Sequence, residues 1–475
     1  MNNWREYRHP LWVFLLASIA SRWPTFFNYL DKDEGTYIAI AQELNAGAQL
    51  YLDIMDLKPP LGLWIFQWME AIFDERIYLY RLLLSILIGL MAWMIFQIQD
   101  QLGGSRKAAW LSGLLFIFLH YFQFAMTFNF EYLMNFFTLL GVLIYVSSKN
   151  KFLAGLFLGL SFCVKYLCLL DFLALIFLMF YESRKKNGRK ILFSLFSAGA
   201  GFILPFFVVN LYFAYQGLWE EFKFVTYIAP GNYSSETTFL EKLQFIFDFH
   251  ITHLLYFILF YLVLFTKGVT ATQKWFYSTW FLATLIATQM TGQQFKHYLL
   301  QVMPALSLMA GAVADSEVKW LFGISHKWRD QINPSLKAQT LVALLFLAAG
   351  IFNYFDHFVE KEPLRNVANY LDNNMNKSDR IYAANCCAYL YSKCDRRPLN
   401  EYVHGSLLVR DVHIRTLDID VEKELLQIQQ AQPEYVVLKN EYRWPEFRQF
   451  LEDEYTLVLN ARKGYRILQK KAIKR

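Results

Sequence analysis

Long apolar runs recur along this chain of 475 residues, and they constrain its fold more than any other feature. From Leu11 to Phe355 the runs approach the ~20 residues that a helix needs to cross a bilayer. Hydrophobic residues make up 56% of the chain and aromatic residues 18%. The pattern therefore predicts a polytopic α-helical membrane protein. The net charge of +6 is spread over separate short loops, which argues against a nucleic-acid partner.

The apolar runs predict about eleven crossings. The fifth and sixth are short and meet at Lys165-Tyr166 without a loop, so they could instead form one broken span. The predicted crossings are 10–30, 77–99, 108–124, 128–147, 152–166, 168–181, 191–213, 250–266, 275–291, 298–315 and 339–355.

Basic residues predict the orientation of these crossings. With the N-terminus in the cytoplasm, the cytoplasmic loops hold 17 Lys and Arg residues and the opposite loops hold 7. This excess is typical of the cytoplasmic side. An odd number of crossings then places the C-terminal tail outside. We expect a transmembrane catalytic domain over residues 1–355 and an extracytoplasmic, periplasmic domain over residues 356–475.

The tail has the rhythm of a small α/β domain. Helix-like runs at 363–374 and 421–430 precede strand-like runs at 380–384 and 434–438. Two further alternating runs, 455–459 and 464–468, predict a hairpin.

The first outer loop, residues 31–76, gathers ionisable residues beside a membrane surface. Such a cluster adds little stability there and indicates a functional site. Tyr37, Ile40, Ala41, Leu44 and Ala48 recur at helical spacing, which predicts an amphipathic helix lying in the interface plane.

Two acidic residues begin this helical pattern. Asp33 and Glu34 are adjacent and diverge by about 100° on a helix, so they have different roles. A carboxylate can accept the proton of an attacking hydroxyl. The alternative is that Asp33 caps the helix and Glu34 complements its dipole.

The loop motif resembles the first outer loop of bacterial GT-C glycosyltransferases of the dolichyl-phosphate-mannose–protein mannosyltransferase-like superfamily, which includes lipid A aminoarabinose transferases. Later segments resemble the family in the same order, and the resemblance spans roughly 10–310. The motif consists of Asp33-Glu-Gly-Thr-Tyr-Ile-Ala-Ile-Ala-Gln-Glu-Leu, Gly47, Tyr51, Asp53 and Asp56-Leu-Lys-Pro-Pro-Leu-Gly62. The later segments are Arg81 with Ser85, Asn129-Phe-Glu131, Gly159–Lys165 and Gly292–Tyr298 leading to Pro304.

The resemblance implies a GT-C-like fold and the transfer of a sugar from a polyprenyl-phosphate donor to an extracytoplasmic hydroxyl or amine on a lipid, glycan or protein. Attack from the face opposite the phosphate would invert the anomeric centre. Asp33 matches the family's catalytic carboxylate and Glu34 its neighbour, while Lys58 matches a cation near the donor phosphate. The resemblance places such an enzyme in the bacterial inner (cell) membrane.

A lipid phosphate leaving group needs fixed cations at the headgroup level. Lys58, Arg81, Lys165 and Lys296 are the predicted donor-phosphate ligands. Arg81 could instead snorkel to the interface. Lys165 lies among apolar residues, where an unpaired ammonium is costly, so we expect a carboxylate or phosphate partner for it.

Six further residues are predicted to bind substrate. For several, ordinary structural roles remain open: Glu131 as a helix-start carboxylate, His297-Tyr298 as an interfacial aromatic pair, and Asp53 and Asp56 as loop turns. The predicted substrate-binding residues are Tyr37, Asp53, Asp56, Glu131, His297 and Tyr298.

One position departs from the family. Relatives that act on lipid A carry an acidic residue immediately before the Lys-Pro, where this chain has Leu57. We predict no metal and no other cofactor, because the sequence offers no independent ligand set.

Two non-enzymatic readings compete with a transferase. Aromatic spans with an intramembrane lysine also suit a lipid-linked-sugar carrier or flippase, although transporters place charge near the midplane of repeated broken helices. A membrane scaffold whose tail binds a partner is the other alternative.

Overall fold

The computed structural model describes residues 4–27, 32–120, 123–184, 188–232, 238–266, 268–290, 295–321, 363–386, 388–440 and 442–472. This part of the chain forms two compact units. The helical unit comprises residues 1–26, 81–209 and 236–359, and the loop-tail unit comprises residues 27–80, 210–235 and 360–475. The predicted boundary at 355/356 lies outside the described residues.

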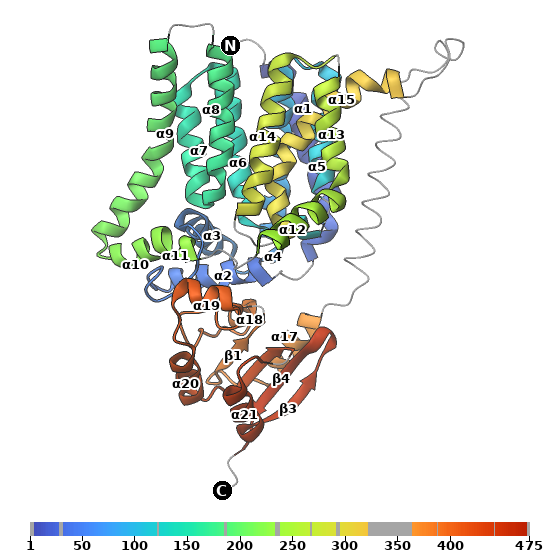
Figure 1. The fold of residues 1–475 in the computed structure, drawn as a ribbon. Helices are drawn as coiled ribbons and strands as arrows, with labels where there is room; N and C mark the ends of the chain where they lie inside the picture. Colours follow the sequence, from blue (N-terminus) through green and yellow to red (C-terminus); the bar gives the residue numbers. More distant parts are fainter. Residues whose placement is uncertain are drawn as a thin grey trace, which may run out of the picture. The chain divides into compact units, whose positions relative to one another are not determined.

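The helical unit is built from helices that pack lengthwise (Figure 1). All of the helices named next lie wholly in this unit, except that the first residues of α4 and the last residues of α9 belong to the loop-tail unit. Its helices are α1 (Trp4–Arg22), α4 (Ile77–Gln101), α5 (Arg106–Leu119), α6 (Phe130–Ser148), α7 (Lys151–Val164), α8 (Leu169–Ser183), α9 (Gly188–Tyr215), α12 (Phe239–Thr252), α13 (Leu254–Phe265), α14 (Ala271–Met290) and α15 (Met303–Leu321), with short 3-10 helices η2 (Gln123–Met126), η3 (Tyr166–Cys168) and η5 (Lys296–Val302).

Side chains at the starts of several helices satisfy the first backbone N–H groups. Ser105 accepts from the Ala108 N–H before α5, and Asn150 accepts from the Leu153 N–H before α7. Thr238 and Glu241 form a reciprocal capping box at α12. These caps fix where the apolar helices begin.

Five helices of the described chain are long and apolar enough to cross a membrane, and α12 with α13, bent by 76°, would make a sixth as one broken span. The five are Ile77–Gln101, Phe130–Ser148, Tyr166–Ser183, Gly188–Tyr215 and Lys296–Ala314. Helices also occupy four other predicted crossings (10–30, 108–124, 152–166 and 275–291) but do not meet this test, and the crossing at 339–355 lies outside the described residues. The helix is interrupted at Lys165, which has an extended backbone, so α7 and α8 are separate helices.

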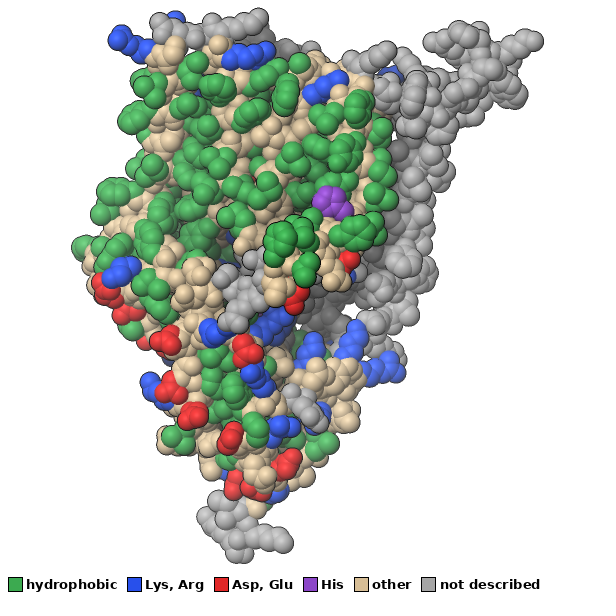
Figure 2. Space-filling model, in the orientation of Figure 1, with side chains coloured by type: hydrophobic (Ala, Val, Ile, Leu, Met, Phe, Trp, Pro, Cys, Tyr) green, Lys and Arg blue, Asp and Glu red, His purple; other side chains and the backbone are tan. Residues whose placement is uncertain are grey.

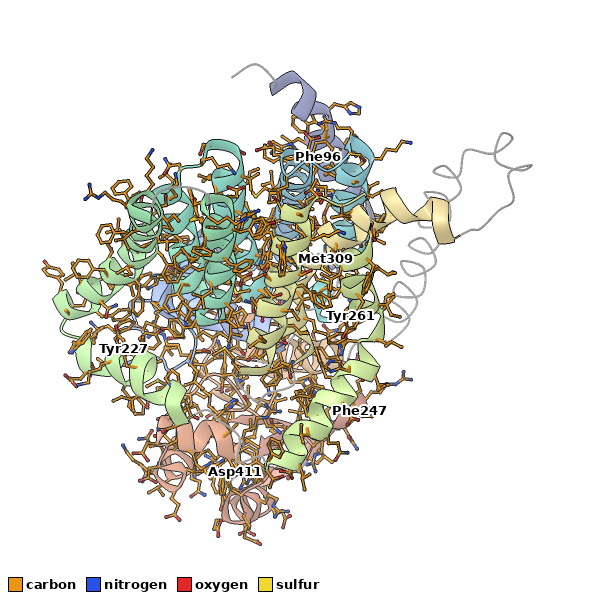
Figure 3. The ribbon with its side chains drawn as sticks, turned by 45° about the horizontal axis from the view of Figure 1, so that its top comes forward. Phe96, Tyr227, Phe247, Tyr261, Met309 and Asp411 are labelled. Carbon is orange, nitrogen blue, oxygen red and sulfur yellow. The ribbon has the colours of Figure 1, made fainter. Side chains whose placement is uncertain are left out.

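Apolar side chains cover much of the helical unit's surface in Figure 2, including α9, whose Phe193 and Phe196 are exposed. In Figure 3, Phe247 and Tyr261 belong to α12 and α13, where both side chains are exposed, whereas Met309 of α15 is fully buried. An apolar exterior of this kind is what a lipid environment requires. The chain is a multi-pass membrane protein.

The loop-tail unit combines the first loop with the C-terminal residues. Its first-loop helices are α2 (Lys32–Asn45) and α3 (Pro60–Phe73), and the segment after α9 supplies α10 (Trp219–Lys223), the π-helix η4 (Phe224–Ile228) and α11 (Ala229–Asn232). Its C-terminal elements are α17 (Pro363–Asn374), β1 (Ile381–Ala384), α18 (Tyr389–Lys393), α19 (Asp411–Leu417), α20 (Val421–Ala431), β2 (Tyr435–Lys439), α21 (Pro445–Glu454), β3 (Tyr455–Asn460), the 3-10 turn η7 (Arg462–Gly464) and β4 (Tyr465–Lys470).

The C-terminal strands form one mixed sheet in the order β1-β2-β4-β3. β1 pairs parallel to β2, with Ile381 opposite Tyr435, whereas β2 and β3 pair antiparallel to β4. The predicted small α/β domain and its terminal hairpin are therefore confirmed.

The prediction that the first-loop helix is amphipathic is wrong. Every residue of α2 from Glu34 to Ala41 is buried, so these two turns have no solvent-facing side. Helices α3 and α18 both pack against α2 and contribute to the burial. Helical spacing in the sequence reported one apolar face but not the polar residues that tertiary packing also encloses.

Candidate functional site

The first turn of α2 presents its two carboxylates to different surroundings. The Asp33 side chain is 25% exposed, whereas Glu34 is fully buried. Adjacent helix positions diverge by about 100°, which accounts for the difference. Asp33 is therefore the member of the pair that a solvent-borne group can reach.

A histidine from the C-terminal tail contacts Asp33. The Nε2 atom of His404 lies 3.2 Å from Oδ1 of Asp33, and the two residues are 371 positions apart in the sequence. The His404 side chain is 12% exposed. Sequence reasoning did not single out His404, because a lone histidine in a polar tail carries no motif.

Lys58 is held by three residues of the same loop. Its backbone N–H donates to Oδ1 of Asp56 over 2.9 Å, and its ammonium lies 3.5 Å from the same oxygen. Its carbonyl accepts from the Tyr51 hydroxyl over 2.6 Å, and its ammonium lies 5.0 Å from the centre of the Tyr37 ring. Pro59 precedes α3, which begins with Pro60, so the backbone after Lys58 is rigid. The lysine keeps 31% of its side chain exposed.

The remaining predicted first-loop residues make structural contacts. The carboxylate of Asp53 accepts from the Gln49 N–H over 2.7 Å, and Asp56 is almost fully buried. These are the loop-turn roles that the sequence left open. Tyr37 is 2% exposed and packs edge-on against Phe66. Sugar contacts by Tyr37, Asp53 and Asp56 stay predictions.

Leu57 has an apolar role in this chain. Together with Met55 it packs against the buried C-terminal cluster that includes Leu407, Leu408 and Tyr442. The backbone N–H of Met55 also donates to the Glu401 carbonyl over 3.0 Å. The position that is acidic in some relatives thus anchors the loop to the tail.

A second polar group lies in the helical unit. Glu131, in the first turn of α6, is 2% exposed and forms an ion pair with Lys165, with the Nε2 atom of His297 at 3.8 Å. The Lys165 ammonium lies 3.9 Å from the centre of the Tyr298 ring. The carboxylate partner expected for Lys165 is therefore Glu131. The extended backbone at Lys165 and the 3-10 geometry of η5 position these groups.

Arg81 is enclosed by protein. It is 2% exposed and donates to the Met126 carbonyl over 2.8 Å, so it does not snorkel outward. Arg22 donates to the carbonyls of His120, Ala125 and Met126 over 3.0–3.2 Å. The two guanidinium groups together hold the connection that precedes α6. Arg22 was missed, although a basic residue at the end of an apolar run is a usable signal.

The last predicted cation, Lys296, is exposed at the start of η5. A buried carboxylate that the sequence reasoning passed over lies in α8. Asp171 accepts from Trp280 Nε1 and from Gln301 Nε2, each over 2.6 Å. A lone aspartate inside an apolar span was a signal for such a network. Because both donors to Asp171 are neutral side chains of the helix packing, we assign this carboxylate a structural role.

The loop-tail unit also holds a buried carboxylate network. Gln42 donates to Glu70 over 2.9 Å and to Glu75 over 2.7 Å, and Tyr80 also donates to Glu70. Burial raises the pKa of Glu70 above its usual range, against the opposing effect of these donors. The network joins α2 to α3 and fixes the helix that carries Asp33.

The two units carry polar groups of different kinds. The loop-tail unit offers a reachable carboxylate at Asp33 and a reachable ammonium at Lys58. The helical unit offers a neutralised carboxylate–lysine pair. Within the described residues, no three or more His, Cys, Asp or Glu side chains gather as metal ligands. The metal independence of the protein stays a prediction.

Sequence comparisons support the family resemblance over part of the chain. Residues 57–213 match the family described as Dolichyl-phosphate-mannose-protein mannosyltransferase. Residues 361–471 match a second family, which is described as the C-terminal domain of the competence-induced protein Ccs4. No curated protein sequence matches the chain. The first match confirms the predicted family resemblance; it begins at residue 57, so Asp33 lies outside the matched range.

Solved structures share the fold over nearly the whole chain. ArnT from Cupriavidus metallidurans aligns with a TM-score of 0.64 at 13% identity, covering 96% of this chain and 97% of that one. Its complex with undecaprenyl phosphate aligns with a TM-score of 0.61 at 14% identity over 97% and 98%. The Archaeoglobus fulgidus oligosaccharyltransferase AglB, in complex with an inhibitory peptide and a dolichol-phosphate, aligns with a TM-score of 0.53 at 11% identity over 98% and 74%. These likenesses show a GT-C membrane fold.

Proposed function

We propose that this protein, which shares the family resemblance and the fold of the GT-C glycosyltransferases, moves a hexosyl or pentosyl group from a polyprenyl phosphate to an extracytoplasmic hydroxyl. The observation that carries the proposal is Asp33, a partly exposed carboxylate at the family's motif position. The binding of undecaprenyl phosphate by ArnT and of a dolichol-phosphate by AglB supports a lipid-phosphate donor.

In the proposed reaction the acceptor oxygen bonds to the anomeric carbon while the bond from that carbon to the phosphate oxygen breaks. Asp33 takes the proton of the acceptor hydroxyl. Attack from the face opposite the phosphate inverts the anomeric centre. The products are the glycosylated acceptor and a polyprenyl phosphate.

The leaving phosphate gains charge, and Lys58 is the first candidate to stabilise it. Its ammonium remains reachable, and Asp56, Tyr51 and Tyr37 fix its position. Lys296 is the next candidate because it is exposed. Arg81 and Lys165 already bind protein groups, so we propose that they support the site's structure as well as any phosphate contact.

We also propose the sidedness. The excess of Lys and Arg in one set of loops supports a cytoplasmic N-terminus, eleven crossings and an extracytoplasmic C-terminal domain in a bacterial inner membrane. Attachment of a membrane-impermeant thiol reagent to a cysteine placed at exposed Arg397, in intact cells, tests this orientation.

The test of the activity uses the full-length protein in lipid with a panel of radiolabelled polyprenyl-phosphate sugars and a membrane extract as acceptor source. Asp33→Asn keeps the shape of the side chain and removes its basicity, so we expect turnover to fall about 100- to 10,000-fold with donor binding retained. Asp74→Asn is the matched control. It removes a carboxylate of the same loop that is 84% exposed, in a left-handed conformation that asparagine tolerates.

Turnover of Asp33→Asn within twofold of wild type contradicts the proposed role of the carboxylate. Donor binding with no transfer by the wild-type protein, for every sugar in the panel, supports the carrier or flippase instead. Loss of all function on removal of the C-terminal domain, with no transfer by the intact protein, supports the scaffold.

A further inference from the structure

The contact between Asp33 and His404 is more than proximity, because the hydrogen bonds of the second histidine nitrogen fix its proton. The Ser406 backbone N–H donates to Nδ1 of His404 over 3.3 Å, and the Ser406 hydroxyl lies 2.7 Å from the same nitrogen. A backbone N–H can only donate, so Nδ1 accepts and the proton of the neutral ring sits on Nε2. Nε2 is the atom that faces Asp33, and it donates to Oδ1.

A second histidine, His413, contacts the serine that fixes the His404 tautomer. Nδ1 of His413 lies 3.2 Å from the Ser406 hydroxyl oxygen and 3.2 Å from the Ser406 carbonyl oxygen. Burial, with smaller contributions from His404, Arg410 and Lys58, lowers the pKa of His413 to about 4. His413 is thus neutral at neutral pH and donates to Ser406. The hydroxyl proton of Ser406 is then left for His404.

The backbone around His404 is clamped as well. A Cβ added at Gly405 would lie 2.7 Å from the Cys386 carbonyl oxygen, so the 404–406 turn packs directly on the chain after β1. The bond between the Met55 N–H and the Glu401 carbonyl and the packing of α18 on α2 tie the same part of the tail to the first loop. His404 and α2 therefore belong to one packed structure.

We propose that His404 is a positioning residue for Asp33: its Nε2–H holds the carboxylate in the orientation in which it meets the acceptor hydroxyl, with Ser406 and His413 fixing the required tautomer. The inference rests on the proposed function. A neutral donor orients the carboxylate without cancelling its charge, which a cation would do. The C-terminal domain is thereby a part of the catalytic apparatus.

The test compares His404→Ala and His404→Gln in the full-length protein in lipid. Loss of an orienting group predicts a fall in kcat of about 10- to 100-fold for His404→Ala, with donor KM changed less than about twofold. The amide nitrogen of glutamine can reach the Nε2 position, so His404→Gln is expected to recover most of the lost kcat. His250→Ala is the control, since His250 is an exposed histidine of α12 for which no role is proposed.

A double-variant cycle separates positioning from general damage. In the Asp33→Asn background, His404→Ala is expected to have little further effect, because the group it orients no longer acts as a base. A wild-type kcat for His404→Ala, or the same fold-loss in both backgrounds, overturns the inference.

Two outcomes tell the failures apart. If Asp33→Asn is inactive and His404→Ala is fully active, the positioning role fails and the proposed function stands. If Asp33→Asn is itself fully active, the proposed role of Asp33 as the base fails and the inference falls with it, while the transfer reaction itself stands. Where His404→Ala does not fold, the His404→Gln comparison and the cycle built on Ser406→Ala still decide the question.

Discussion

Asp33 and Glu131 are carboxylates near the start of a helix, and their surroundings give them opposite properties. Glu131 in the helical unit is almost fully buried and forms an ion pair with Lys165, with His297 close by. Asp33 in the loop-tail unit is partly exposed and accepts from His404. The comparison shows that the residue type does not decide whether a carboxylate is buried in an ion pair or stays partly exposed: its surroundings decide.

The largest effect is expected where the buried ion pair is broken. Glu131→Ala leaves the Lys165 ammonium without its carboxylate, which should cost about 3–5 kcal/mol of stability. Asp33→Asn should change stability by less than about 1 kcal/mol, because its side chain is partly exposed and asparagine still accepts a hydrogen bond. Thermal unfolding of both variants in the same detergent measures the difference.

The double variant Glu131→Gln with Lys165→Gln is the control for that prediction, since it removes both charges together. It should be more stable than Glu131→Ala. An Asp33→Asn protein as unstable as Glu131→Ala would erase the contrast between the two carboxylates.

The second prediction concerns pH and the support behind Asp33. The pKa of His413 is about 4 in the folded protein, below the unfolded value of 6.5. The unfolded chain therefore takes up the proton first as pH falls. The contribution of neutral His413 to the free energy of unfolding is fully present above pH ~6.5 and is lost as the pH falls towards ~4. It amounts to roughly 3 kcal/mol at most.

The stability difference between wild type and His413→Gln, measured by thermal unfolding at pH 7.5, 6 and 5, should therefore shrink as the pH falls. Hydrogen exchange, corrected for the intrinsic pH dependence of its rate, should show the loss in α19 and not in α6. A difference that is constant over this range would contradict the prediction.

The third prediction tests the anchor between the loop and the tail. Leu57→Glu puts a charge against the apolar C-terminal cluster and should cost about 1–3 kcal/mol. The matched control is Leu52→Glu, because Leu52 is 42% exposed and its substitution should stay within about 0.5 kcal/mol. Hydrogen exchange of α2 is the measurement. Equal effects at the two positions would mean that Leu57 does not anchor the loop.

The smallest effect is expected at Tyr51. Its backbone has a φ of 71°, a left-handed conformation unusual for an aromatic residue, and its hydroxyl donates to the Lys58 carbonyl. Tyr51→Phe removes one hydrogen bond, worth about 1 kcal/mol. If this bond places Lys58, donor KM should rise about fivefold with little change in kcat. Tyr215→Phe, at an 89% exposed tyrosine, should leave donor KM unchanged.

The sequence by itself determined the membrane class, the position of most helices, the α/β tail and the family resemblance carried by the first loop. Apolar periodicity and short motifs are local signals, so they can be read without a structure. The same locality produced the error at α2, where the spacing of apolar residues could not report that polar neighbours are buried too.

Only the tertiary structure decided which polar groups meet. Asp33 and His404 are 371 residues apart, and Glu131 in α6 and Lys165 at the break after α7 are 34 apart. The packing of Leu57 on the tail likewise depends on a cluster drawn from residues beyond 380. Such contacts arise from packing between distant segments, and no spacing rule along the chain encodes them. For that reason the sequence named the carboxylate at Asp33 but not the histidine that contacts it.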